Sequence, residues 1–303
     1  MRAAGGKGKS AQRPSYAAAA GADENSAGGG ASPRPAAARE TTTMAGAERV
    51  ALIAGGVEDA AESVARELIR RDWAVALHGP AGEALDRAVE RLDADAEWTD
   101  QVAACPGELT VAADREQLVE RVLDEFDRVD LLVCTPAGPA AGQDLLEMVQ
   151  ESYEHVQAAC VTAPLFLAQR VANEMVRLVE AGAIEAAKIV FVNSIGAYTS
   201  FAGRPAHCLA AAATAMLARL FADALGEHGI NVYEVRAGLI SYRGADEVHA
   251  RYGRLIEEGL TPIRRWGRPQ DIALAVAAVA DDLLPFSTGE VINVDGGFHL
   301  RRL

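Results

Sequence analysis

Short apolar runs alternate with longer amphipathic stretches along the chain from Glu48 onward. Runs of four to six apolar, β-branched positions predict buried strands, and apolar positions at helical spacing predict helices that cover them. The expected strands are 49–54, 73–78, 108–112, 129–134, 188–193, 231–236 and 290–294. The expected helices are 60–71, 82–92, 115–126, 145–180, 207–228 and 269–280.

This regular order of strand and helix is typical of a parallel sheet with helices on both faces. We therefore predict an α/β fold, with one Rossmann-like, doubly wound parallel sheet of about seven strands. The folded domain is expected to span residues 48–303, with no internal repeat and no second folded domain.

Residues 1–47 have a different composition, with 15 alanines, 8 glycines and no hydrophobic periodicity. Such a segment buries too little apolar surface to offset its ordering entropy, so we predict a disordered extension. Its basic residues are a feature of an organelle transit peptide over residues 1–43, although Asp23 and Glu24 count against that interpretation. The alternatives are a plain extension, or a start at Met44 in place of Met1.

Charge and cysteine content exclude several classes of function. The chain carries a formal charge of −14. Residues 1–47 contain six basic and three acidic residues, so the remaining residues carry a formal charge of −17. Nucleic acid is not an expected partner, since phosphate binding needs clustered cations. No run of about 18 uncharged apolar residues indicates a membrane span. The sequence contains four scattered cysteines, Cys105, Cys134, Cys160 and Cys208. Their spacing matches neither a disulfide framework nor a metal site, so we expect a cytoplasmic protein with no bound metal.

Three C-terminal segments resemble the short-chain dehydrogenase/reductase family, especially 3-oxoacyl carrier-protein reductases and pteridine reductases. Two of them, R-W-G-R-P-Q-D-I-A (265–273) and T-G-E-V-I-N-V-D-G-G-F (288–298), are similar to the closing segments of that family. The third, H-G-I-N-V-Y-E-V-R-A-G-L-I (228–240), resembles its sixth strand, with Ala237 where the family usually has proline. The resemblance runs from about residue 49 to the C-terminus and implies a fold that binds NAD or NADP.

The family's glycine-rich turn, T-G-x-x-x-G-x-G, corresponds here to A-G-G-V-E-D-A-A, residues 54–61. Gly55 matches the first glycine and is followed by Gly56, whereas Asp59 and Ala61 replace the other two. Carboxylates of Glu58 and Asp59 at a helix start would themselves occupy the positive end of the helix and oppose a phosphate. The simpler interpretation is an acidic helix cap, and on these grounds no cofactor is predicted.

Other cofactor contacts of the family also differ. The fourth strand ends in C-T-P-A-G (134–138) where the family has N-N-A-G, and Val111 stands nearest to the family's adenine-side aspartate. The second strand ends in His78-Gly79, with neither an acidic residue for a ribose hydroxyl nor an arginine directly after it.

The resemblance also implies where the catalytic residues should stand. Ser194 matches the family's serine, but His207 takes the place of the tyrosine, Ala211 of the lysine and Cys160 of the asparagine. Beyond the extension the chain has one lysine, Lys188, at the opposite end of the fifth strand. Classical catalysis needs a tyrosine whose pKa a nearby lysine lowers.

Two hypotheses about function follow. The first is a family member that has lost classical catalysis, a pseudoenzyme that binds a protein or a small ligand. The alternative is an atypical NAD(P)-dependent oxidoreductase that reduces a carbonyl or related substrate, with Ser194 and His207 as hydrogen-bonding and acid groups. A cysteine near His207 could also form a nucleophilic pair, although cysteine is more often a small buried apolar residue. For Tyr198 a packing role is the simpler interpretation.

The resemblance further implies a homo-oligomer, a dimer or tetramer, that assembles through the helices near 147–180 and 207–227. Ala210, Ala213 and Ala218 would allow a close helix approach there, as they would against the helix's own sheet. Residues 241–265 correspond to the family's substrate-covering loop.

Overall fold

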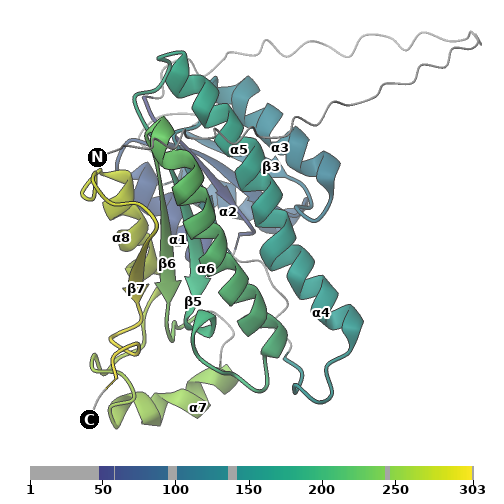
Figure 1. Cartoon of the computed structure of the whole chain (residues 1–303), viewed down its shortest axis with the longest axis vertical. Coiled ribbons are helices and arrows are strands. Elements are labelled where there is room, and N and C mark those ends of the chain that lie inside the picture. The colour runs from purple at the N-terminus through teal and green to yellow at the C-terminus, as the bar shows by residue number, and fades with distance from the viewer. Residues whose placement is uncertain (1–47, 58, 95–100, 136–141, 243–245, 302–303) are drawn as a thin grey trace, which may run out of the picture. The chain divides into compact units, whose positions relative to one another are not determined.

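The computed structural model describes residues 48–57, 59–94, 101–135, 142–242 and 246–301 (Figure 1). Seven parallel strands form one sheet in the order β3-β2-β1-β4-β5-β6-β7. They are β1 (Val50–Ala54), β2 (Ala74–Gly79), β3 (Val102–Pro106), β4 (Leu131–Cys134), β5 (Ala187–Ser194), β6 (Ile230–Ala237) and β7 (Glu290–Val294). The sheet therefore confirms the predicted doubly wound fold, whereas the predicted extension, 1–47, lies outside the described residues.

Helices cover both faces of this sheet, so the central strands are almost wholly buried, whereas the edge strands β3 and β7 are more exposed. One apolar cluster joins the sheet to α3 (Ala112–Phe126), α5 (Ala163–Glu180) and α6 (Pro205–Leu225). The second cluster joins it to α1 (Asp59–Ile69), α2 (Glu83–Asp93) and α8 (Pro269–Ala280). Two layers of helices thus bury the sheet and leave its carboxyl edge for a site.

The third strand was predicted in the wrong place. Residues 108–112 lead into α3, and Val111 precedes its first residue with a largely exposed side chain. The strand is instead β3, whose residues Val102 to Pro106 pair with Val75 to Gly79 of β2. Leu109 and Val111 made the later segment look more strand-like, but the pairing with β2 favours the earlier one.

The predicted helix 145–180 is also interrupted. It consists of α4 (Gln150–Gln157), a π-helical turn (Ala158–Thr162) and α5, while Leu145 and Leu146 lie exposed before it. A helix α7 (Asp246–Glu257) occupies part of the segment expected to cover the substrate. π-helical turns often occur at functional sites, and this one contains Cys160.

Among the described residues, one stretch is long and apolar enough to cross a membrane, Pro205–His228. It comprises α6 and the turn after it, and α6 packs against β5 and β6. Its apolar character therefore belongs to a core helix of the sheet's covering layer. At the amino edge of the sheet, Lys188 pairs with Asp282 at 2.8 Å, which leaves it at the end opposite the carboxyl edge, as predicted.

Candidate active site

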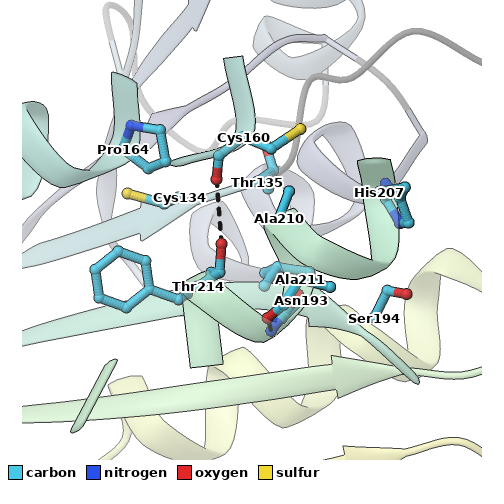
Figure 2. A pocket seen from close by; sticks show the side chains of 12 residues that line it. Cys134, Thr135, Cys160, Pro164, Asn193, Ser194, His207, Ala210, Ala211 and Thr214 are labelled. Carbon is cyan, nitrogen blue, oxygen red and sulfur yellow. Dashed lines mark hydrogen bonds between the residues drawn. The ribbon is translucent and has the colours of Figure 1, made fainter. Parts of the chain in front are cut away.

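A small pocket lies at the carboxyl ends of β4 and β5, under the start of α6 (Figure 2). Its volume is about 30 Å³, room for one or two water-sized groups. All four residues assigned from the resemblance to catalytic positions line it: Ser194, His207, Ala211 and Cys160. The fold therefore brings these four positions together.

Ser194 is the last residue of β5, and its side chain caps a short 3-10 turn, Ile195–Ala197. Its Oγ accepts a hydrogen bond from the backbone N–H of Gly196 at 2.9 Å. A serine hydroxyl that accepts one bond still has a hydrogen to donate. The turn therefore holds the oxygen in place and leaves its O–H available to a ligand.

His207 lies in the first turn of α6, two residues after Pro205, which takes the first helical position. A Cβ atom built on Gly196 would stand 3.1 Å from Ser194 Oγ, 3.6 Å from His207 Cδ2 and 3.7 Å from Ala211 Cβ. Ser194 and His207 thus converge on one glycine, and Figure 2 shows both at the same end of the pocket. A side chain at position 196 would therefore crowd Ser194 Oγ.

The imidazole of His207 is neutral at neutral pH. Burial lowers its pKa from the ordinary 6.5, and the positive charge of Arg204 lowers it further. A neutral imidazole carries one N–H donor and one acceptor nitrogen. His207 can therefore accept a proton from a hydroxyl group, or donate one once it is protonated.

This lowered pKa predicts a loss of stability on acidification. Below pH 6.5 the unfolded chain binds a proton at residue 207 that the folded chain resists, so folding stability is complete above that pH and falls as the pH drops toward the folded pKa. Urea unfolding from about pH 7.5 to about pH 5 should show a larger loss for the native protein than for His207→Gln. Equal losses in the two proteins would contradict a lowered pKa for this group.

At the positions of the family's lysine and asparagine, Ala211 and Cys160, the backbone carbonyl oxygens accept hydrogen bonds from other side chains. The carbonyl oxygen of Ala211 accepts from Asn193 Nδ2 at 2.9 Å. The carbonyl of Cys160, in the π-helical turn, accepts from the hydroxyl of Thr214 at 3.1 Å. Asn193 and Thr214 were not identified from the sequence, although an asparagine in the apolar strand V-F-V-N-S was a usable signal.

The geometry does not support a cysteine nucleophile. Burial raises the pKa of Cys134 to about 12, so its thiol stays protonated and is a poor nucleophile. Cys208 donates to the carbonyl of Thr199, 3.5 Å away. Among the described residues, no group of three or more His, Cys, Asp or Glu side chains could hold a metal ion.

Tyr198 makes contacts on the β6–β7 side of the site. Its hydroxyl donates to Asp295 Oδ2 at 3.2 Å, and its ring lies 5.3 Å from the guanidinium carbon of Arg236. Burial and the carboxylate of Asp295 raise the pKa of Tyr198 to about 12. It therefore remains a protonated phenol with its donor already used, which agrees with the packing role expected for it.

The turn after β1 provides a second, backbone-built part of the site. Gly55 and Gly56 have φ values of 131° and 141°. At Gly55 a Cβ would stand 1.8 Å from the carbonyl oxygen of Thr135, so only glycine fits between β1 and β4. Below the turn, the N–H of Gly55 approaches His78 Nδ1 at 3.4 Å. Glu58 and residues 136–138, on which other sequence predictions rest, lie outside the described residues.

Comparison with known proteins relates this chain to dehydrogenases and reductases. Residues 58–299 match the family model described as enoyl-(acyl carrier protein) reductase. The chain is 26% identical over 251 residues to an L-rhamnose-1-dehydrogenase of Scheffersomyces stipitis, covering 82% of this chain and 95% of that protein. It is 28% identical over 258 residues to the rhamnolipids biosynthesis 3-oxoacyl-[acyl-carrier-protein] reductase of Pseudomonas aeruginosa, covering 84% and 97%.

Among solved structures, similarity extends to a protein that was crystallised with a dinucleotide. A 3-oxoacyl-[acyl-carrier protein] reductase from Brucella melitensis, crystallised in complex with NAD, superposes with a TM-score of 0.77 at 29% identity. The match covers 84% of this chain and 98% of that one.

These findings contradict the first sequence-based hypothesis, a pseudoenzyme that acts by binding alone. Relatives that match most of the chain are named as dehydrogenases and reductases, and they favour the oxidoreductase alternative. The error came from reading each replaced residue separately, because the fold still places a hydroxyl and an imidazole together at the end of β5.

Proposed function

Because the chain belongs to the short-chain dehydrogenase/reductase family, we propose that it is an NAD(P)-dependent oxidoreductase that interconverts a carbonyl and an alcohol. The observation that carries the proposal is the convergence of Ser194 and His207 on Gly196 at the carboxyl end of β5. Both side chains can exchange hydrogen bonds with one substrate oxygen, which is the requirement of this chemistry.

The residues after β1 fit a dinucleotide at the level of the backbone. Gly55 and Gly56 turn the chain into α1, whose N-terminal N–H groups attract a pyrophosphate. In the first turn of α1, Glu62 binds Arg91 through both carboxylate oxygens, at 2.9 and 2.7 Å, and also binds Arg66 at 3.1 Å. The charge of Glu62 is thereby neutralised, so it adds little to the opposition to a phosphate that the sequence assigns to Glu58 and Asp59.

At the β2 end of the crevice, His78 supports the same fit. Its side chain is 3% exposed, and Nε2 has no hydrogen-bond partner among the described residues. Burial lowers the pKa of His78, so the ring is neutral. His78 lies at the end of β2, where this fold binds a ribose, and the backbone of Gly107 acts on the ring as a hydrogen-bond partner besides the N–H of Gly55. A ligand's oxygen at this place would complete the bonding of Nε2.

In the proposed reaction, a bound nicotinamide would supply or accept the hydride. In the oxidation direction, neutral His207 removes the proton from the alcohol oxygen, and the Ser194 hydroxyl donates a hydrogen bond to that oxygen. In the reduction direction, protonated His207 returns the proton, and Ser194 stabilises the developing negative charge. The lowered pKa of His207 favours the base form at neutral pH.

Cofactor binding by the full chain tests the proposal directly. We expect micromolar affinity for NADH in a calorimetric titration, with NADPH about tenfold weaker. The preference follows from Glu108 and Asp114, whose carboxylates act on His78 and would repel a 2′-phosphate. Asp114→Asn should reduce the difference in affinity between NADH and NADPH. Asp124→Asn, farther along the same helix, should leave that difference unchanged. No binding of either cofactor at millimolar concentration would overturn the proposed function.

We also propose that the chain forms a homo-oligomer through α4, α5 and α6. Leu209, Met216 and Leu220 lie along one side of α6 and are 53%, 49% and 58% exposed, and Phe166 of α5 is 44% exposed. Apolar side chains at this spacing form a stripe that favours burial against a second copy. Location in the cytoplasm stays a prediction.

A charge placed in this stripe should dissociate the assembly. Leu220→Asp is expected to reduce the molar mass measured by light scattering at micromolar concentration to that of a smaller species, because a carboxylate would be buried in an apolar contact. Leu255→Asp, which changes a leucine of α7 that is 43% exposed, is the matched control and should leave the mass unchanged. An unaltered mass for Leu220→Asp would place the interface elsewhere.

A further inference from the structure

Asn193 occupies a buried position directly before Ser194 and uses both hydrogens of its amide. Its Nδ2 donates to the carbonyl of Ala211 at 2.9 Å and to Glu234 Oε1 at 2.8 Å, and the residue is 5% exposed. Because both acceptors lack a hydrogen of their own, the amide has one possible orientation. Asn193 therefore connects β5, α6 and β6 at a fixed angle.

The acceptor on β6 is itself held in place. Glu234 is 1% exposed and accepts two hydrogen bonds from Arg236, from Nε and Nη2, each at 2.7 Å. Such bidentate pairs are geometrically specific, and the ring of Tyr198 covers the guanidinium. Asn193 and Arg236 stand opposite each other in the sheet register, so the chain of bonds is short.

The two ends of this chain of bonds bear directly on the site. Ser194 follows Asn193 in the strand, and His207 lies one helical turn before Ala211 on the same face of α6. A bond from Asn193 to the Ala211 carbonyl thus sets the end of β5 against the start of α6. A shift of about 1 Å between catalytic groups can cost about 10²-fold in rate.

We propose that Asn193, oriented by Glu234 and Arg236, is a positioning residue that sets Ser194 against His207. Its effect on turnover rests on the proposed oxidoreductase function, whereas its effect on the surroundings of His207 does not. Because both hydrogens of its amide bond to the protein, Asn193 is inferred to act through the positions of Ser194 and His207.

The test replaces Asn193 with leucine, which has a similar shape and no donor. Asn231→Leu is the matched control, because Asn231 lies on the neighbouring strand β6 near its amino end and its Nδ2 contacts the Pro285 carbonyl at 3.3 Å. We expect Asn193→Leu to lower kcat about 10- to 100-fold with little change in KM, and the control to retain kcat within about twofold.

A second readout is independent of activity. In NMR titrations, the pKa of His207 should rise toward 6.5 in Asn193→Leu, because a loosened start of α6 admits water to the ring, and it should stay lowered in Asn231→Leu. A folded Asn193→Leu with native kcat and a native His207 pKa would overturn the positioning role. If the native protein neither binds cofactor nor turns over, the proposed function fails, and the titration still decides the role of Asn193.

A double variant guards against loss of the fold in Asn193→Leu. Glu234→Leu combined with Arg236→Leu removes the acceptor that orients Asn193 and leaves no buried charge behind. We expect a folded protein with kcat lowered about 3- to 10-fold and a partial rise of the His207 pKa, because the bond to Ala211 remains. Native values for both quantities would contradict the orienting role of Glu234.

Discussion

Replacement of His207 with alanine is expected to lower kcat/KM by about 10²- to 10⁴-fold in either direction of the reaction, the usual loss when a general acid or base is removed. Its imidazole is the titratable group placed beside Ser194, and its lowered pKa keeps it in the base form at neutral pH. Steady-state kinetics with the preferred cofactor and a panel of alcohols and carbonyls would measure the change.

The pH profile identifies His207 more specifically than the rate alone. In the oxidation direction, kcat/KM of the native protein should fall as the pH drops below the His207 pKa, which lies under 6.5, and the variant should lack this limb. His155→Ala, an exposed histidine of α4, is the control and should keep both rate and profile. If His207→Ala retained the native rate, another group would have to move the proton.

Replacement of Glu234 with alanine is expected to lower the free energy of unfolding by about 3–5 kcal/mol. The variant leaves the guanidinium of Arg236 buried without its bidentate partner, and removes an acceptor from Asn193. Urea unfolding at neutral pH measures the loss. A change below about 1 kcal/mol would show that water reaches Arg236 and compensates the charge.

Two comparisons separate the buried pair from ordinary surface charge. Glu258→Ala breaks an exposed pair with Arg254 on α7 and should cost about 0.5 kcal/mol or less. The double variant Glu234→Leu and Arg236→Leu should be far more stable than Glu234→Ala, because no unpaired charge remains. These two outcomes together would show that the pair contributes to the geometry of the site more than to net stability.

Local sequence pattern was sufficient for most of the fold. The strand ending at Ser194 and the helix containing His207 were predicted close to their observed bounds, because each buries a long apolar run. The third strand was misplaced because Leu109 and Val111 resemble a strand locally, and pairing with β2 is a long-range fact. The π-helical turn at Cys160 was missed because its stabilising partner, Thr214, is 54 residues away.

The residues that line the pocket could be predicted one at a time from the sequence, whereas the function of the protein could not. Matching Ser194, His207, Ala211 and Cys160 to catalytic positions led to four residues that the fold indeed gathers in one pocket. The same residue-by-residue comparison led to the wrong function, since relatives across the chain are dehydrogenases and reductases. The replacement of a family's catalytic residue does not determine whether the remaining groups of the site can catalyse a reaction together.

The sequence by itself determined the class of fold and the order of its elements. It also determined which groups lie near the carboxyl edge of the sheet. These depend on periodicity and residue type, which are local properties of the chain. Only the tertiary structure decided that Ser194 and His207 share Gly196, that Glu62 is neutralised by Arg91, and that Asn193 joins Ala211 to the Glu234–Arg236 pair. Distances of this kind arise between residues far apart in the chain, and they are set when the two helical layers pack on the sheet.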